Sequence, residues 1–296
     1  MSRFPSRIVC LTEETTETLY LLGEDWRIVG ISGFTVRPAR ARREKPKVSA
    51  FTSARLDRIV ALKPDLVLGF SDLQAEIAAG LIRAGVAVYV FNQRSIEEIL
   101  GMIGMLGGLI GCQGKALELC SRLEAGLDDV RRAARSLARR PRVYFEEWDQ
   151  PQISAIRWVS ELIAVAGGED CFPELAAEPL GARRIVADPM EVVCRAPDII
   201  IGSWCGKKFA PQQVAARPGW QGVPAVVERE LHEVKSALIL QPGPAALTDG
   251  VAALSAIIRG WAQRRANPSA FAYAAFAAGS RLINISDPAR FTNVDA

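Results

Sequence analysis

Short apolar runs alternate along the chain with segments in which apolar residues recur every three or four positions. The runs predict strands, and the helical spacing predicts helices. In the first part of the chain, the predicted strands are residues 8–11, 28–31, 47–48, 66–68 and 87–91, and the predicted helices are 15–22, 53–62, 72–85 and one that begins at Ser95. This alternation is typical of a mostly parallel sheet with helices on both faces.

Residues 114–137 interrupt this rhythm. Apolar residues recur at helical spacing along one face, while arginines such as Arg122 and Arg131 cover the other face. The pattern predicts one amphipathic helix about twice the mean helix length of about 12 residues. Just before it, the glycines of residues 101–111 lie in an apolar helical stretch, which favours close packing of helices. A second α/β unit follows, with predicted strands at 143–145, 199–201, 225–227 and 231–234 and predicted helices at 156–166 and 243–263.

We therefore expect an α/β protein with two Rossmann-like α/β lobes, joined by a single long helix, and a ligand cleft between the lobes. The predicted boundaries are 1–112 for the N-terminal lobe, 113–140 for the connecting helix, 141–266 for the C-terminal lobe and 267–296 for a C-terminal extension. Within the extension, residues 270–278 are small and apolar but too few to span a membrane, so we expect them to pack as a helix across the body.

Composition narrows the class of protein. The 296 residues are 49% hydrophobic and 23% charged, with a formal net charge of +3, and no basic stripe with interleaved aromatics is present. A nucleic-acid partner is therefore not expected. The single histidine, His232, excludes a zinc site built on several histidines, and we expect neither a metal site nor a catalytic cofactor. The six cysteines form no C-x-x-C pair, which favours reduced thiols.

The first residues do not show a basic region followed by an apolar stretch, and no window approaches the roughly 20 apolar residues of a membrane span. We expect no membrane insertion, a monomer, and a cytoplasmic location for the chain as written. A start codon assigned at the wrong place would instead allow a periplasmic location.

Common catalytic motifs fail in detail. The stretch from Gly202 to Lys208 is one residue too short for a phosphate-binding loop and carries Lys208 where Ser or Thr would bind magnesium. A G-x-S-x-G elbow is absent from the sequence. Glu146 and Glu147 are neighbours on a predicted strand and point to opposite faces, so they do not form an acid–base pair. The sequence favours a protein that is not an enzyme.

Aromatic and polar residues gather where predicted strands end, which is the ligand-facing edge of a parallel sheet. Such aromatic walls with a few polar anchors suit a bulky amphipathic ligand. The candidate ligand-binding residues are Phe34, Phe51, Phe70, Glu146, Trp148, Trp158, Ser203, Trp204, Cys205, Lys207, Lys208 and Arg37, the last opening a basic run that continues through Arg40, Arg42, Arg43 and Lys45.

Four stretches carry a resemblance to a known family: RIVCLTEETTETLYLLG at 7–23, DRIVALKPDLVLG at 57–69, residues 158–168, and residues 187–202. Together they resemble the BtuF-like, cobalamin-binding branch of the helical-backbone substrate-binding proteins of ABC transporters, which also includes ferric-siderophore binders. The resemblance covers about residues 7–262. It implies two lobes around one rigid helix, a ligand in the cleft, a small closing motion, and an acidic residue on each lobe that docks onto the permease.

Glu76 matches the first docking position, whereas Gln212 and Gln213 stand near the second. Three hypotheses follow. The first is a non-enzymatic binder of cobalamin or a similar corrinoid, working with an ABC transporter permease. The second is a binder of a metal–siderophore or other anionic chelate, held by the arginine run. The third is a cytoplasmic enzyme or regulator that reuses the fold, with Cys205 as its reactive centre.

Overall fold

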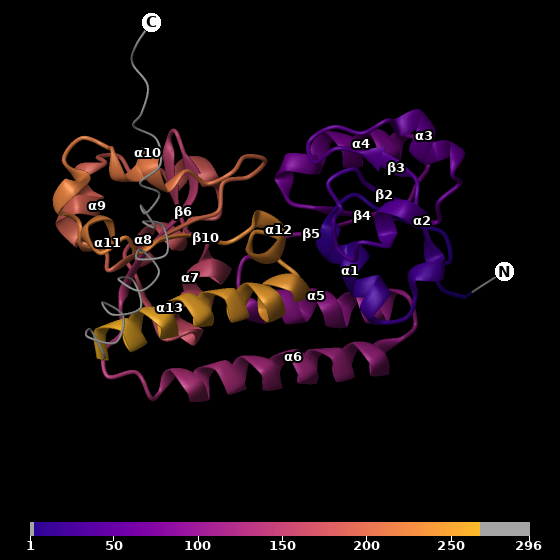
Figure 1. Ribbon diagram of the computed structural model, residues 1–296. Helices are drawn as coiled ribbons and strands as arrows, with labels where there is room; N and C mark the ends of the chain where they lie inside the picture. Colours follow the sequence, from indigo (N-terminus) through magenta and orange to yellow (C-terminus); the bar gives the residue numbers. More distant parts are fainter. Residues whose placement is uncertain (1–2, 267–296) are drawn as a thin grey trace, which may run out of the picture.

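The computed structural model describes residues 3–266, and the extension that we expected to pack across the body lies outside these residues. Figure 1 shows two lobes set side by side over a layer of long helices. The expected α/β class with two lobes is confirmed. Its elements follow from the alternation of apolar runs and helical periods along the chain.

The N-terminal lobe is built on a parallel sheet of five strands in the order β3-β2-β1-β4-β5. The strands are β1 (Ile8–Cys10), β2 (Ile28–Ser32), β3 (Lys47–Ser49), β4 (Leu66–Phe70) and β5 (Val88–Phe91). The connecting helices are α1 (Glu13–Leu21), α2 (Ala41–Glu44), α3 (Leu56–Ala61) and α4 (Ala75–Arg83), with short 3-10 turns η1 (Asp25–Arg27) and η2 (Asp72–Gln74). Because β4 is buried at every position, its apolar run is continuous, as expected for a central parallel strand.

The C-terminal lobe has a second five-stranded sheet, ordered β10-β9-β6-β7 with β8 on β6, and only β7 runs antiparallel to its neighbour. Its strands are β6 (Arg142–Asp149), β7 (Gln152–Ser154), β8 (Glu169–Asp170), β9 (Ile199–Gly202) and β10 (Leu231–Glu233). Its helices are α7 (Arg157–Val165), α8 (Pro173–Ala176), α9 (Met190–Arg195), α10 (Pro211–Ala215), α11 (Pro224–Val227) and α12 (Ser236–Ile239), with 3-10 turns η3 (Gly181–Arg183) and η4 (Trp220–Gly222).

One predicted strand is wrong. Residues 225–227 belong to helix α11, whose first position is Pro224. Proline has no N–H to donate and a φ angle that suits the first turn of a helix, so the apolar run after it begins a helix. Ala225 points into the smaller apolar core of this lobe, which satisfies the same hydrophobic pattern.

Three helices form the layer beneath the lobes: α5 (Ile96–Leu109), α6 (Gln113–Ala134) and α13 (Val251–Ala266), with α13 preceded by a π-helical turn, η5 (Ala246–Gly250). Figure 1 shows α6 running along the underside of both lobes. The predicted long helix is α6, which ends at Ala134. Gly107 of α5 lies directly against the methyl group of Ala116 on α6, which is the close helix packing that the glycine-rich stretch predicts.

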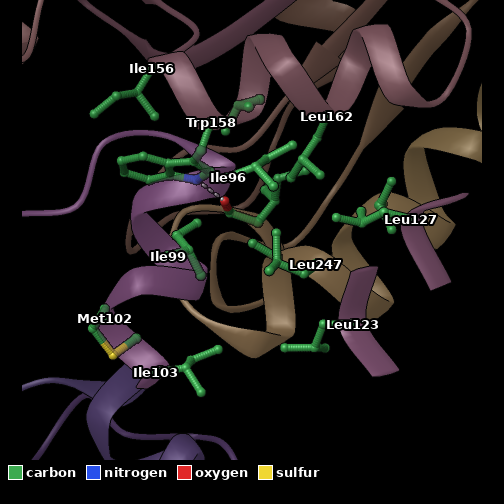
Figure 2. Close-up of a cluster of buried hydrophobic side chains, with 14 of the residues drawn as sticks. Ile96, Ile99, Met102, Ile103, Leu123, Leu127, Ile156, Trp158, Leu162 and Leu247 are labelled. Atoms are coloured by element: carbon green, nitrogen blue, oxygen red, sulfur yellow. Dashed lines mark hydrogen bonds between the residues drawn. The ribbon is translucent and has the colours of Figure 1, made fainter. Parts of the chain in front are cut away.

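The largest apolar core lies between the sheets and this helical layer and joins both lobes. Figure 2 shows part of it, with Trp158 of α7 packed among side chains from α5, α6 and the 239–247 segment. The indole N–H of Trp158 donates to the carbonyl of Ile239 at 2.8 Å. Continuous burial through this layer makes the helices a common support for both sheets.

Among residues 3–266, none of the helices combines the length and the apolar character that crossing a membrane requires.

Candidate functional site

The carboxyl ends of β1 and β4 and the loop after β3 are tied together by Gln74, which is 1% exposed. Its amide nitrogen donates to the carbonyl of Phe51 at 2.8 Å, and its amide oxygen accepts from the Phe70 N–H at 2.9 Å. A buried amide with both ends bonded holds backbone segments in one arrangement. Gln74 therefore fixes the loop that carries Phe51 beside the end of β4.

The three phenylalanines predicted at this edge differ in exposure. Phe34, in the loop after β2, is 62% exposed, Phe51 is half-buried, and Phe70 is buried. The guanidinium of Arg94 lies 4.8 Å from the centroid of the Phe70 ring. Phe34 and Phe51 thus present aromatic surface, whereas Arg94 covers Phe70.

In the C-terminal lobe, Lys207 links two of the predicted tryptophans. Its Nζ lies 4.6 Å from the ring centroid of Trp148 and 5.0 Å from that of Trp204, and it forms an ion pair with Asp149 at 2.5 Å. An ammonium group between two aromatic rings is attracted to the negative faces of both. Trp148 is half-buried and Trp204 is buried, so Trp148 is the ring that this arrangement leaves open to a ligand.

Glu146 has a different role from the predicted ligand contact. Its carboxylate is completely buried and accepts two hydrogen bonds from Arg217, at 2.6 and 2.9 Å. It also accepts from the Tyr144 hydroxyl at 3.0 Å and from the Trp204 indole N–H at 3.0 Å. A buried carboxylate needs such partners to offset its lost hydration. Glu146 therefore positions Trp204 from inside the lobe.

Trp158 is also corrected by the structure. It is 3% exposed and lies in the core shown in Figure 2, so it supports the fold and does not line a cleft. The prediction failed because a tryptophan at the start of a helix has the same local pattern whether it faces the core or a ligand. Ser203 is 1% exposed, and its hydroxyl has no hydrogen-bond partner in the part of the chain that the structure describes.

Cys205 lies in the loop after β9 and is exposed as a residue. Burial of its thiol raises the pKa of Cys205, and the carboxylate of Glu147 raises it further, against a hydrogen bond with Ser236. A raised pKa leaves little thiolate at neutral pH, and thiolate is the reactive form. This environment is unlike that of a catalytic cysteine.

Much of the basic run makes contacts within the protein. Arg37 forms ion pairs with Glu17 at 2.9 Å and Asp249 at 2.7 Å. Arg42 donates to the carbonyls of Gly33 and Thr35, both at 3.0 Å. These arginines brace the loop after β2, which is a structural role.

A hollow of about 330 Å³ lies at the carboxyl ends of β9 and β10. It brings together Trp204, Lys207 and Lys208 of the predicted set, and its remaining lining residues are Gly206, Glu233, Val234, Lys235 and Ser236. Lys235 forms an ion pair with Glu233 at 2.7 Å, whereas the Lys208 side chain has no ion-pair partner among residues 3–266. The hollow therefore carries excess positive charge beside an aromatic wall.

Polar contacts fasten the two lobes to each other. The Gln93 amide donates to the Pro242 carbonyl at 2.8 Å, and Glu17 accepts from the Ala245 N–H at 3.0 Å. The ion pair between Arg37 and Asp249 adds a third link. These contacts hold the N-terminal lobe against residues 242–249, the segment that leads from α12 into α13.

Comparison with known proteins agrees with this architecture. Residues 8–238 match the model of a family described as periplasmic binding protein. This chain belongs to the periplasmic binding protein family. The match covers most of the chain and confirms the resemblance inferred from the four sequence stretches.

Two known proteins with sequences similar to this one carry names that describe binding proteins. The ABC transporter substrate-binding lipoprotein YvrC of Bacillus subtilis is 26% identical over 265 residues, covering 85% of this chain and 79% of that protein. The vitamin B12-binding protein of Vibrio parahaemolyticus is 25% identical over 245 residues, covering 81% of this chain and 85% of that protein. Both names describe binding proteins, which agrees with the family match and favours a binding protein over an enzyme built around Cys205.

Two solved structures show the same fold. The periplasmic vitamin B12 binding protein BtuF of Vibrio cholerae superposes with a TM-score of 0.68 at 20% identity, covering 88% of this chain and 98% of that chain. The periplasmic heme-binding protein RhuT from Roseiflexus superposes with a TM-score of 0.71 at 24% identity, covering 86% and 99%. The fold is shared by neighbours with different ligands, so ligand identity depends on side chains.

Two arginines of this binding protein, Arg94 and Arg184, were not among the candidate residues predicted from the sequence. Arg94 follows β5 directly, so its position at a strand end was a signal that could have revealed it. Arg184 lies in an irregular segment with no such signal, yet its side chain is 2% exposed. Arg94 lies over the Phe70 ring in the N-terminal lobe, and Arg184 donates to Glu147 in the C-terminal lobe at 2.6 Å.

Residues 3–266 contain no cluster of three or more His, Cys, Asp and Glu side chains arranged to hold a metal ion. His232 instead bonds to Glu230 at 2.7 Å, and Arg264 clamps the same carboxylate. A second hollow of about 720 Å³ lies among α5, α6 and α7, away from the strand ends. Its lining residues are Ile96, Glu97, Leu100, Glu124, Leu127, Arg131, Glu161, Ala164 and Val165.

Proposed function

We propose that this substrate-binding protein binds cobalamin or a related corrinoid at the junction of its lobes. The observation that carries the proposal is aromatic surface presented at the ends of both sheets: Phe34, 62% exposed, in one lobe, and half-buried Trp148 in the other. A broad macrocycle with apolar faces and a polar rim fits such walls. The name of the Vibrio parahaemolyticus relative, vitamin B12-binding protein, supports the same ligand.

Affinity for a corrinoid arises mainly from burying ring surface, at about 25 cal/mol per Å² before the costs of association. Trp148 supplies a rigid ring, and Lys207 holds it through the ammonium contact at 4.6 Å. Trp204, fixed by Glu146, keeps Lys207 in place from the other side. The wall is therefore built before the ligand arrives, which lowers the entropic cost of binding.

The test is a titration of the purified protein with cyanocobalamin, followed by tryptophan fluorescence and by isothermal calorimetry. We expect saturable binding with a dissociation constant at or below the micromolar range, and at least tenfold weaker binding by Trp148→Ala. Trp158→Phe is the matched control, because Trp158 lies in the core and its change should leave affinity within twofold. Absence of saturable binding at micromolar cyanocobalamin contradicts the proposal.

A second candidate, an anionic metal chelate, is favoured by the hollow beside Trp204. Of its three lysines, Lys207 pairs with Asp149 and Lys235 with Glu233, which leaves Lys208 as the one without an ion-pair partner among residues 3–266. Hemin is the probe for this candidate, because heme is the ligand named for the neighbour RhuT. Binding of hemin that weakens with added salt and with Lys208→Ala would favour this candidate over a corrinoid, since exposed charges are screened by salt.

Docking onto a permease belongs to the same proposal. Glu76 lies in the first turn of α4 with an exposed side chain that has no ion-pair partner among residues 3–266. It is thus free to meet a basic residue of another protein. Glu76→Lys should abolish stimulation of the transporter's ATPase while leaving cyanocobalamin affinity unchanged. Equal stimulation by both proteins would exclude Glu76 from docking.

A further inference from the structure

The hollow at the carboxyl ends of β9 and β10 adjoins the aromatic wall proposed for the ligand. Lys207 belongs to both, because it lines the hollow and its Nζ lies 4.6 Å from the centroid of the Trp148 ring. Trp204 also lines the hollow, and its ring centroid lies 5.0 Å from the same Nζ. A group attached to a ligand that rests on Trp148 is therefore within reach of the hollow.

The size of the hollow suits one side group of a ligand better than a whole macrocycle. Its volume of about 330 Å³ lies at the lower end of the range of about 300–1,000 Å³ that is typical of small-molecule sites. Two loops form it: one follows β9 and carries Gly206 and Lys208, and the other follows β10 and carries Lys235 and Ser236. The hollow thus has room for a substituent while the ring of the ligand stays outside it.

The charges around the hollow leave one positive charge unpaired. Lys207 forms an ion pair with Asp149 at 2.5 Å, and Lys235 forms one with Glu233 at 2.7 Å. The hydrogen bond from Lys235 lowers the pKa of Glu233, so this carboxylate is ionised at neutral pH and already has its counterion. Lys208 has no ion-pair partner among residues 3–266. A ligand group with a single negative charge would therefore balance the site.

Unused hydrogen-bond donors accompany this charge. The ammonium group of Lys208 and the backbone N–H groups of Gly206 and Lys208 make no hydrogen bond within residues 3–266. Gly206 has open space where a side chain would stand, which leaves the backbone there accessible. Separate point donors suit a tetrahedral anion with several oxygen atoms, whereas a planar carboxylate pairs best with the fork of an arginine. None of the described residues that line the hollow is an arginine.

From this geometry we infer that the hollow binds the phosphodiester in the nucleotide arm of a complete corrinoid, and that Lys208 selects for it. The inference rests on the proposed corrinoid function and adds a preference among corrinoids. A phosphodiester has one negative charge, which matches the unpaired charge of Lys208. Its two free oxygens accept hydrogen bonds from the Lys208 ammonium and the Gly206 N–H while the ring of the ligand rests against Trp148.

The experiment compares cyanocobalamin with dicyanocobinamide, a corrinoid with the same ring and an amide-bearing rim but without the phosphodiester and its base. We expect the wild-type protein to bind cyanocobalamin at least fivefold more tightly at low ionic strength, and added salt to reduce this preference, because exposed charges are screened. Lys208→Gln should weaken cyanocobalamin binding about fivefold and change dicyanocobinamide affinity by less than twofold. Lys208→Arg, which keeps the charge, should retain most of the preference. Lys47→Gln removes the same charge from an exposed position on β3 in the other lobe, and as the control it should change neither affinity.

Lys208 is exposed, so its substitutions should leave the fold intact. Equal or tighter binding of dicyanocobinamide by the wild-type protein overturns the inference and leaves the proposed function standing. The same holds if Lys208→Gln weakens the binding of both corrinoids equally, or of neither. The phosphorus NMR signal of cyanocobalamin should shift on binding to the wild-type protein and shift less with Lys208→Gln; an unshifted signal in the wild-type complex also overturns the inference. Failure of the wild-type protein to bind either corrinoid overturns the proposed function itself, and the inference with it.

Discussion

The carboxylate of Glu146 and the guanidinium of Arg217 form a two-point ion pair, with distances of 2.6 and 2.9 Å, and the carboxylate is completely buried. Residues 71 positions apart in sequence are thereby joined beneath Trp204. Burial lowers the pKa of Arg217, but Glu146 more than compensates, so its pKa is raised overall. Arg217 therefore stays positively charged at any ordinary pH.

Removing one partner of this ion pair should strongly destabilise the fold. Arg217→Ala leaves the Glu146 carboxylate buried with only the Tyr144 and Trp204 donors, and breaking such a pair costs about 3–5 kcal/mol. We expect this loss in the free energy of unfolding, measured with urea. Arg43→Ala, at an exposed position, should change it by no more than about 0.5 kcal/mol. A loss below 1 kcal/mol for Arg217→Ala would show that the pair contributes little.

Two glycines of α5 should respond in opposite directions to the same substitution. A Cβ at residue 107 would collide with Ala116, so Gly107→Ala should force α5 and α6 apart at a cost of about 1–3 kcal/mol. Residue 104 has open space around it, and Gly104→Ala should stabilise the helix by about 0.5–1 kcal/mol. Thermal unfolding of both variants shows whether each substitution raises or lowers the stability of the protein. The same sign for both would contradict the packing of α5 on α6.

Two acidic residues at the start of α1 predict how stability depends on pH. Burial raises the pKa of Glu13 to about 8, with Glu17 and Glu14 adding to the rise and the Val36 N–H opposing it. Burial also raises the pKa of Glu14 to about 7, although the hydrogen bond from the Thr12 hydroxyl lowers it. The folded protein then keeps protons that the unfolded chain has released above its ordinary value of 4.5. Stability contributed by these groups is full below that value and falls as the pH rises toward 8.

Glu13→Gln tests this sign, because glutamine is neutral at every pH. The variant should lose less stability than the wild-type protein between pH 5 and pH 8, by about 1–3 kcal/mol, since one pKa unit corresponds to about 1.4 kcal/mol. Glu118→Gln, on the exposed face of α6, is the matched control and should leave the slope unchanged. Urea unfolding at both pH values measures the difference, and parallel slopes for Glu13→Gln and wild type would contradict burial of Glu13.

The cysteines should react with iodoacetamide in the order of their environments. Cys194 is exposed and should react before Cys205, whose pKa is raised by burial and by Glu147. Burial raises the pKa of Cys10 and of Cys171 to about 12, so both should react only after unfolding. Peptide mass mapping over a time course at pH 7 measures the order. Preferential labelling of Cys205 would contradict the assigned environment of its thiol.

Much of the fold was predictable because its signals are local. The apolar run at 66–68 and the helical spacing at 114–137 arise from which face of each element is buried, and both predicted the right kind of element, β4 and α6. The strand predicted at residues 225–227 failed because a three-residue apolar run fits either structure, and Pro224 decided in favour of a helix. Short segments carry too few positions for periodicity to distinguish the two.

The sequence by itself determined the two α/β lobes, the long helix and the strand ends at which we propose that the ligand binds. The tertiary structure alone decided which side chains at those ends face outward. Trp148 and Trp158 have similar sequence signals, yet one is half-buried at a strand end and the other lies in the core. Arg184 gave no signal at all. The reason is physical: burial of a side chain depends on segments distant in the chain that pack over it, and local periodicity does not record them.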